Sequence, residues 1–348
     1  MISQRIRKVQ QQLGREKLDA LLVTNPVNLF YLFGIAEEEC FALVARHKTL
    51  FYVSALNYPE ARQIVKGNSV TVISTRETSA EFIKTCKARK IGFESHNLTV
   101  HSLTIWKKTL CQAKLVPTIG LIEDLRLVKD KEEIALIRKA AAIADAVCQQ
   151  IKPMIKPGVT EQFIAGKIDA LIRAKGCEPA FKTIVASGPG SAVPHHAISN
   201  RKLNENDIVM MDFGAIYKGY RSDLTRTIFL GKINKIHQSL YDLVSAAQSE
   251  AIKAIKPGVK TQVIDQAARR IISQAGYGNY FIHTTGHGLG LEIHEAPRLS
   301  TKDTVILRPG MVVTVEPGVY LSGRGGVRIE DMVLVTPAGQ EVLTKAAK

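Results

Sequence analysis

An internal repeat constrains the fold of this chain more than any other feature of its sequence. The segment Ile155–Val159, Ile-Lys-Pro-Gly-Val, recurs one hundred residues later as Ile255–Val259. A helical pattern of apolar residues follows each copy, and an apolar segment with an acidic residue near its end follows each helix, at residues 207–214 and 310–318. Because the parallel continues over so many residues, we predict two similar α/β halves related by a pseudo-twofold axis.

The residues before the repeat predict a separate, smaller α/β domain. Four short apolar runs are candidate strands, at residues 20–23, 41–44, 49–53 and 70–73, and a further strand is expected at 91–94. Residues 117–120 are a plausible boundary, and Asp130 with Glu133 predicts a capping box that begins a helix ending near Ile151. We therefore expect an α/β (α+β) chain with domains at residues 1–122 and 123–348.

Composition excludes several classes of protein. The 348 residues are 45% hydrophobic and 23% charged, which is ordinary for a globular protein and excludes a disordered or collagen-like chain. No apolar run is long enough to span a bilayer, and the first residues favour an amphipathic helix over a signal peptide. The five scattered cysteines favour reduced thiols and a cytoplasmic location. The net charge of +15 leaves a nucleic-acid partner open, but the dispersed basic residues make one unlikely.

Two acidic residues of the first half lie in apolar, strand-like segments. A lone acid in such a segment is costly to bury, and Asp212 follows a run of Val and Met. Asp223 comes eleven residues later, and a hairpin with its midpoint between Tyr217 and Lys218 would place the two carboxylates directly opposite each other. Their Cβ atoms would then lie ~5 Å apart.

The second half repeats this arrangement with two glutamates. Glu316 and Glu330 have their midpoint at Gly323, within the turn-forming sequence Ser-Gly-Arg-Gly-Gly. Four carboxylates that meet in a low-dielectric site cannot all ionise without cations. The pattern favours two divalent metal ions between the halves, and the alternative is a pair of ordinary hairpins with surface acids.

A histidine-rich segment could provide the nitrogen ligand of such a site. His283, His287 and His294 lie within twelve residues. The four-residue spacing of the first two is that of a helical zinc pair, but Thr-Thr-Gly between them is poor in a helix and the glutamate of that motif is absent. The glycines favour strands or loops that closely approach another part of the chain.

Five residues in these segments resemble the ligand set of the pita-bread-fold metallopeptidases, specifically the branch of prolidase (Xaa-Pro dipeptidase) and aminopeptidase P. The resemblance is strongest at residues 208–227, 285–298 and 309–331. It implies that Asp212 and Asp223 hold one metal ion, that His287 and Glu316 complete the second site, and that Glu330 and Asp223 bridge. It also implies Mn²⁺, with Co²⁺ or Zn²⁺ as alternatives, and a bridging hydroxide as the nucleophile.

The same resemblance implies roles for further residues. Glu316 would also shuttle the proton, and His195 and His294 would act on the substrate carbonyl or the leaving group. The adjacent His196 would exchange roles with His195 if the match shifted by one residue. Residues of the substrate pocket would be His283, His196, Arg298, as a carboxylate-binding arginine, and Arg328, which also supports the region of Glu330.

The resemblance therefore implies a cytoplasmic, homodimeric peptidase that hydrolyses the Xaa-Pro bond at the N-terminus of proline-containing dipeptides or short peptides. Dipeptides are the first choice, because Ser54–Tyr58 lacks the Asp-x-Arg-Tyr signature of many aminopeptidase P N-terminal domains. Methionine aminopeptidase and creatinase are less favoured relatives of the same fold. A catalytically inactive pita-bread protein that binds nucleic acid or a protein partner is the alternative from another class.

Overall fold

The computed structural model describes residues 2–37, 39–65, 70–74 and 88–348. The chain divides into two compact units, Met1–Arg126 and Leu127–Lys348. This division lies four residues after the boundary proposed from sequence, and Pro117 and Thr118 belong to a strand instead of a linker. Among the described residues, no helix has both the length and the apolar character needed to cross a bilayer.

The first unit contains a mixed six-stranded sheet with helices around it. Its strands lie in the order β4-β3-β2-β1-β5-β6, with β2 antiparallel to both β1 and β3 and the other pairs parallel. The strands are β1 Ala20–Val23, β2 Phe41–Ala45, β3 Thr49–Val53, β4 Val70–Ser74, β5 Lys90–Glu94 and β6 Lys114–Thr118; the helices are α1 Ile2–Arg15, α2 Pro26–Phe33, α3 Tyr58–Ile64, α5 Val100–Thr109 and α6 Glu123–Arg126. All five strands predicted from sequence are confirmed.

Local signals explain where these elements begin and end. The central strand β1 is buried at every residue, as expected for a strand covered on both faces. Asn25 caps α2 by accepting a hydrogen bond from the Val27 backbone, and Pro26 takes the first helical position. Gly34 ends the helix in a left-handed conformation with φ of 77°.

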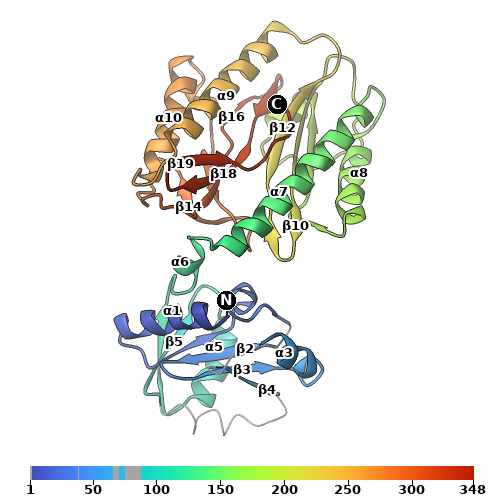
Figure 1. Ribbon diagram of the computed structural model, residues 1–348. Helices are drawn as coiled ribbons and strands as arrows, with labels where there is room; N and C mark the ends of the chain where they lie inside the picture. Colours follow the sequence, from blue (N-terminus) through green and yellow to red (C-terminus); the bar gives the residue numbers. More distant parts are fainter. Residues whose placement is uncertain (1, 38, 66–69, 75–87) are drawn as a thin grey trace. The chain divides into compact units, whose positions relative to one another are not determined.

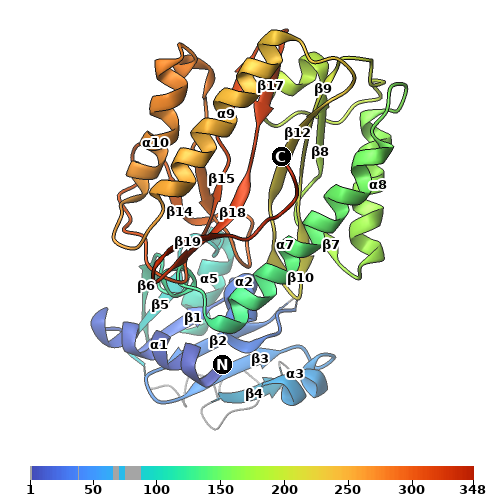
Figure 2. The same cartoon turned by 45° about the horizontal axis from the view of Figure 1, so that its top comes forward.

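The second unit has four long helices, two main sheets and two small ones, β11-β10-β7 and β16-β17. One main sheet has the order β12-β9-β8 and the other β14-β13-β15-β18-β19. Its helices are α7 Lys131–Ile151, α8 Glu161–Ala174, α9 Lys235–Ala254 and α10 Thr261–Gln274; its strands are β7 Glu178–Pro179, β8 Ile184–Ser187, β9 Ile208–Phe213, β10 Ala215–Tyr217, β11 Tyr220–Arg221, β12 Leu224–Phe229, β13 Gly286–Gly288, β14 Glu295–Leu299, β15 Val312–Val315, β16 Gly318–Leu321, β17 Gly325–Arg328, β18 Asp331–Thr336 and β19 Gly339–Val342. In Figures 1 and 2, α7 and α8 lie on one side of these strands, and α9 and α10 lie on the other.

The predicted repeat is visible in the order of these elements. Helices α8 and α10 begin one hundred residues apart, and β8-β9-β12 corresponds to β13-β15-β18. Each half has its own apolar core: one is built around α7, α8 and β9, and the other around α9, α10 and β15. Helix α7 begins at the capping box of Asp130 and Glu133 and ends at Ile151, as predicted.

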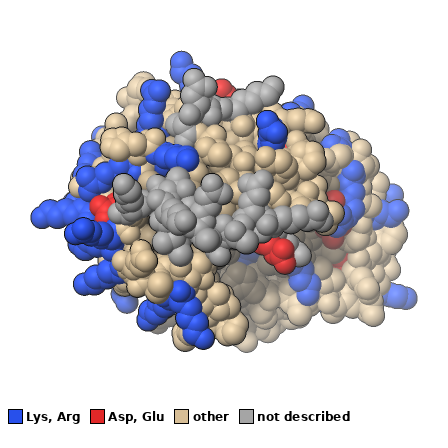
Figure 3. Space-filling model, turned by 90° about the horizontal axis from the view of Figure 1, so that it is seen from below, with Lys and Arg blue, Asp and Glu red and all other residues tan. Residues whose placement is uncertain are grey.

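Four of the five cysteines lie within the described residues, and all four are free thiols. Cys40, Cys148 and Cys177 are buried free thiols, whereas the free thiol of Cys111 is exposed and so is not a core residue. Cys86 lies outside the described residues. On the face drawn in Figure 3, Lys and Arg side chains gather at the left edge and few acidic side chains are visible, which agrees with the net charge of +15.

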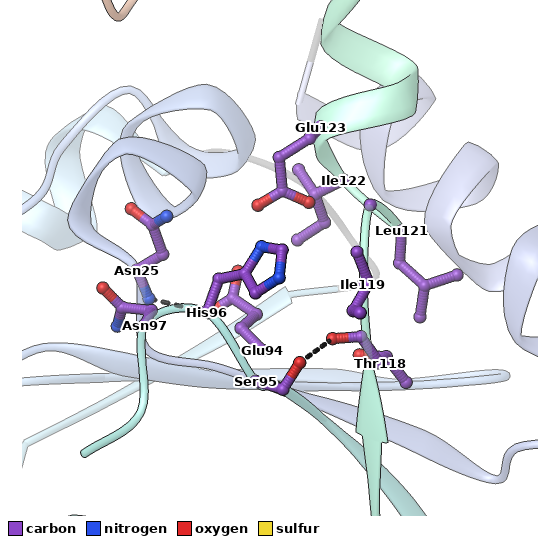
Figure 4. A pocket seen from close by; sticks show the side chains of 11 residues that line it. Asn25, Glu94, Ser95, His96, Asn97, Thr118, Ile119, Leu121, Ile122 and Glu123 are labelled. Atoms are coloured by element: carbon purple, nitrogen blue, oxygen red, sulfur yellow. Dashed lines mark hydrogen bonds between the residues drawn. The ribbon is translucent and has the colours of Figure 1, made fainter. Parts of the chain in front are cut away.

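A buried polar network joins three elements of the first unit. Glu94, at the end of β5, accepts hydrogen bonds from the backbones of Thr24 and Asn25 and from the Asn28 amide, each at 2.7 Å. The same amide donates to Glu123 of α6 at 2.7 Å. Figure 4 shows Glu94 and Glu123 with His96 beside a small pocket. Burial raises the pKa of Glu94, hydrogen bonds from Asn28 and the backbone oppose this, and the charge of Glu123 adds to it.

The raised pKa predicts how the stability of this unit depends on pH. A carboxyl with a raised pKa in the folded state binds more protons than in the unfolded state, so its contribution to stability falls as pH rises from its ordinary value of 4.5 through the raised value. The free energy of unfolding of the wild type relative to Glu94→Gln should therefore decrease over this range. Urea titrations followed by the fluorescence of Trp106, the only tryptophan, report on this unit. A difference that is constant or that increases with pH would contradict the assignment.

Candidate metal centre and active-site cavity

One cavity of the second unit, of about 690 Å³, collects every site residue proposed from the sequence. Its lining includes Asp212, Asp223, His287, Glu316 and Glu330, together with His195, His196, His283, His294, Arg298 and Arg328. These side chains come from both halves of the repeat. The cavity is therefore built between the halves, as the pseudo-twofold arrangement requires.

The register of the first hairpin differs from the prediction. Asp212 lies opposite Thr225 and not opposite Asp223. The reason is the turn: Lys218 and Gly219 both have positive φ, 48° and 87°, and form the two central residues between β10 and β11. The midpoint thus lies one residue further along the chain than predicted. Since Asp223 and Thr225 are two residues apart, Asp223 is the diagonal neighbour of Asp212 instead of its direct partner.

The register of the second hairpin is confirmed. Gly318 pairs with Arg328 and Leu321 with Gly325, which places the midpoint at Gly323. The adjoining strands keep the same register, with Val315 opposite Asp331. Glu316 and Glu330 therefore lie opposite each other in the short gap between the two pairs of strands.

Ligand-type atoms of three buried residues converge at the centre of the cavity. Atoms of Asp223, His287 and Glu330 lie within 4.8 Å of one another. His287 Nε2 is 3.6 Å from Asp223 Oδ2 and 3.2 Å from Glu316 Oε1. The cluster thus contains carboxylates of both hairpins around one imidazole.

Backbone geometry fixes the orientation of that imidazole. His287 Nδ1 lies 3.0 Å from the Gly288 carbonyl oxygen, so this nitrogen carries the proton and Nε2 is directed to the carboxylates. Strand β13 can pass this close to its neighbours only because glycines flank His287. A Cβ at Gly286 would lie 2.0 Å from the Thr314 carbonyl oxygen, and one at Gly288 would lie 2.2 Å from that of Ala296. This confirms the close backbone approach predicted from the glycines.

Burial and mutual repulsion make the cluster unfavourable as a set of anions. Burial raises the pKa of Asp223 well above its usual range, and the charges of Glu330 and Asp212 add to the effect. Burial and the charge of Glu316 do the same for Glu330. Burial also acts on Glu316, but the hydrogen bond and charge of His287 lower its pKa to about 2. A cation bound among these carboxylates would offset their repulsion.

Two buried oxygen atoms support the presence of a metal site. Among the described residues, neither Asp212 Oδ1 nor Glu330 Oε1 has a hydrogen-bond partner, although both are shielded from solvent. The second oxygen of each carboxylate is held, since Arg328 donates to Asp212 Oδ2 at 2.6 Å and Thr225 Oγ1 donates to Glu330 Oε2 at 2.7 Å. The free oxygens and one imidazole fit a divalent ion that prefers oxygen and nitrogen ligands, and none of the described cysteines lines the cavity.

The remaining histidines differ in how they are held. His283 accepts at Nε2 from the hydroxyl of Tyr320 at 2.9 Å, and its ring lies at the wall of the cavity. His294 packs edge-on against His287, with ring centroids 4.5 Å apart. Burial lowers the pKa of His294, as does the positive charge of His287. His196 bonds to Glu161, whereas the exposed His195 ring has no hydrogen bond among the described residues.

Sequence reasoning missed three residues that hold this site together. Thr225 faces Asp212 and bonds to Glu330, and Tyr320 lies between Arg328 and His283, 3.0 Å from the guanidinium. Thr314 bonds to both the His287 backbone and Glu316. The alternation of β12 and β15 could have indicated the threonines, because each is two residues from an acidic residue of the cavity.

Comparisons with known proteins agree over the whole chain. Residues 135–337 match the model of metallopeptidase family M24, and residues 5–128 match the creatinase/prolidase N-terminal domain. The chain is 37% identical over 349 residues to the Xaa-Pro dipeptidase of Pyrococcus furiosus, with 100% of this chain and 99% of the relative covered.

Solved structures show the same relationship. An Xaa-Pro dipeptidase from Bacillus anthracis has a TM-score of 0.97 at 36% identity, with 100% of this chain and 99% of that one covered. An X-Pro aminopeptidase from Thermotoga maritima has a TM-score of 0.90 at 30% identity, with 97% and 98% covered.

The repulsion between the buried carboxylates predicts that Asp223→Asn has different effects on stability with and without metal. Asp223→Asn removes a repelling charge, so the chelator-treated variant should melt at or above the wild-type temperature. Mn²⁺ at about 100 times its Kd should add about 2.7 kcal/mol to the free energy of unfolding of the wild type and little to that of the variant. Thermal melts with Mn²⁺ or chelator test this. Asp242→Asn, an exposed position on α9, should keep the full Mn²⁺ effect. An equal Mn²⁺ effect in Asp223→Asn would refute the site.

Proposed function

Because the chain belongs to metallopeptidase family M24, as its sequence predicted, we propose that it is a dinuclear-metal peptidase that hydrolyses Xaa-Pro bonds, with dipeptides as the preferred substrates. The observation that carries the proposal is the convergence of both acidic hairpins and His287 in one cavity. The Xaa-Pro dipeptidase from Pyrococcus furiosus, 37% identical over 349 residues, supports the choice of substrate.

The residues that would hold two ions are the five that the sequence singled out. Asp212 and Asp223 would hold the first, His287 and Glu316 the second, and Asp223 and Glu330 would bridge. Mn²⁺ is the first choice because the donors are mainly carboxylate oxygens, and Co²⁺ or Zn²⁺ are alternatives. Such a pair of ions supplies an activated water and polarises the scissile carbonyl.

The chain's own groups would position the substrate and move the proton. Glu316 lies at the cavity wall and retains some solvent contact, with 17% of its side chain exposed. It would accept the proton of the attacking water and pass it to the departing proline nitrogen. His195 and His294 would donate hydrogen bonds to the oxygen that becomes negative in the tetrahedral intermediate. His283 and His196 would contribute to the substrate pocket.

An Xaa-Pro bond needs this kind of site for a physical reason. Its tertiary amide has no N–H, and the proline ring fixes φ. A peptidase that holds the scissile amide through its N–H therefore loses that contact. Apolar side chains at the cavity wall offer a surface for the ring, namely Phe181, Ile184, Pro194 and Ile293.

The cavity also contains basic side chains that bear on substrate length. Arg298 lines it, is exposed, and is the proposed partner of the substrate's terminal carboxylate. Arg328 is placed differently: it is buried and bonds to Asp212, Thr225 and Tyr320, so its main contacts support the metal ligands. A carboxylate-binding residue at the cavity wall would favour dipeptides, whose carboxylate lies directly on the proline.

We further propose that the peptidase is a cytoplasmic homodimer. Four of the five cysteines are described and all four are free thiols, which suits a reducing compartment. Sedimentation velocity tests the dimer, for which two copies of the 38.2 kDa chain are expected.

Activity with a series of proline peptides tests the reaction. The Mn²⁺-loaded protein should hydrolyse an Xaa-Pro dipeptide faster than an Xaa-Pro-Xaa tripeptide, and chelator should abolish both activities. Faster cleavage of the tripeptide would instead favour an aminopeptidase. With two ions bound per chain, inertness toward both peptides would refute the proposed reaction and favour a binding protein.

Arg298→Met tests whether Arg298 recognises the terminal carboxylate of a dipeptide substrate. A charge-assisted hydrogen bond to the carboxylate contributes about 1.5–3 kcal/mol, so KM for the dipeptide should rise about tenfold or more. KM for a tripeptide with an amidated C-terminus should change little, because that substrate has no carboxylate. Arg270→Met, at an exposed position of α10 away from the cavity lining, is the matched control. Equal effects on both substrates would exclude carboxylate recognition by Arg298.

A further inference from the structure

One buried carboxylate holds together the two ends of the loop that carries His195 and His196. Glu161 lies in the first turn of α8 and is 0% exposed. Its Oε1 accepts hydrogen bonds from the backbone and hydroxyl of Ser187, at 2.8 and 2.6 Å. Its Oε2 accepts from the backbone and hydroxyl of Ser199, at 3.1 and 2.6 Å. Each oxygen therefore holds one end of the segment 188–198.

The same carboxylate also contacts the loop between its ends. His196 Nε2 lies 3.0 Å from Glu161 Oε2. Burial would raise the pKa of Glu161, but the hydrogen bonds from Ser187, Ser199 and His196 outweigh it and lower the pKa, so the carboxylate remains ionised. With five hydrogen-bond donors around one ion, the two ends of the loop cannot separate without exposing or orphaning a buried charge.

The loop reaches the second half of the repeat at two further points. Gly326 of β17 donates its backbone N–H to Ser191 Oγ at 2.9 Å. Arg328, which binds Asp212, donates to the Pro194 carbonyl oxygen at 3.2 Å. Pro194, the residue before His195, is thus hydrogen-bonded to Arg328, while Glu161 holds the two ends of the loop through Ser187 and Ser199.

The second half holds its histidine segment in a comparable way with different residues. Asp265 of α10 is 0% exposed and accepts from the backbone and hydroxyl of Thr285, at 3.2 and 2.8 Å. It pairs with Arg269, which donates to the carbonyl oxygens of Phe281 and His283, both at 2.9 Å. In both halves, a buried carboxylate of the corresponding helix fixes the backbone that presents histidines to the cavity.

We propose that Glu161 is a positioning residue of the peptidase reaction, which acts by holding the loop so that His195 faces the substrate. The inference rests on the proposed function, because it takes His195 to act on the substrate. The His195 ring is exposed and has no hydrogen bond among the described residues, so the backbone of its loop determines where it lies. His196, which the sequence offered as the alternative to His195, is hydrogen-bonded to Glu161 and helps to hold the loop together.

A double-mutant cycle separates positioning from general stabilisation. Glu161→Gln keeps the size of the side chain but offers an acceptor to only one end of the loop, so kcat/KM should fall about 10- to 100-fold, mainly in kcat. His195→Ala should cause a similar loss. In the His195→Ala background, Glu161→Gln should reduce kcat/KM less than about threefold further, because its effect passes through the missing ring.

Controls keep this result interpretable. Each variant should retain the Mn²⁺-induced rise in melting temperature, which shows that the fold and the metal centre are intact. Glu178→Gln makes the same substitution at an exposed ion pair with Arg173 on α8 and should leave kcat/KM unchanged. Independent, multiplicative losses in the double mutant, or no loss in Glu161→Gln, would overturn the proposal.

A readout that needs no substrate separates failure of this inference from failure of the proposed function. In protein labelled with ¹³C at histidine Cε1, the resonance of His195, assigned from His195→Ala, should shift or broaden in Glu161→Gln. Those of His47 and His237, which lie outside the cavity lining, should stay in place. An unchanged His195 resonance would overturn the proposal even if no peptide were hydrolysed.

Discussion

Two pairs of carboxylates, one from each half of the repeat, repel each other inside a cavity that shields them from water. Asp223 and Glu330 are buried, and their pKa values are raised well above the ordinary range, first by burial and then by neighbouring acids. Folding alone does not favour such an arrangement. The fold holds it because strands on both sides are fixed by apolar cores, one for each half. Cations would offset this cost, and this links the shape of the cavity to its chemistry.

The residues behind the proposed ligands balance this charge. Arg328 faces Asp212, and on the far side of Glu330 the buried Arg226 pairs with Asp331 at 2.8 Å. Arg226 also donates to the backbone carbonyls of Glu330 and Ala346, so the last residues of the chain are part of the support. On each side of Glu330, an acidic side chain is thus paired with a basic one: Asp212 with Arg328, and Asp331 with Arg226. Asp212 and Glu330 each keep one free oxygen, while the other oxygen accepts a hydrogen bond from Arg328 or Thr225.

The sequence predicted the elements that chemistry specifies locally and missed those that depend on tertiary contact. The repeat, the capping box at Asp130 and the midpoint at Gly323 were all readable, because turn residues and apolar periods act over short distances. The midpoint of the first hairpin was predicted one residue too early, because Lys218 adopts a positive φ, which residues other than glycine rarely do. Tyr320 and Glu161 could not be identified, since their roles arise only where residues far apart in sequence meet. In the sequence, Glu161 resembles any acidic residue in the first turn of a helix. Its role depends on Ser187 and Ser199, which contact it only in the folded chain.

Anomalous X-ray scattering from crystals of the Mn²⁺-loaded protein tests the central claim most directly. Difference maps from data collected above and below the manganese absorption edge should show two peaks within the cavity. One should contact Asp212 and the other His287 and Glu316, with Asp223 and Glu330 reaching both. A single peak, or manganese bound only outside this cavity, would contradict the view that the two halves exist to hold a pair of cations.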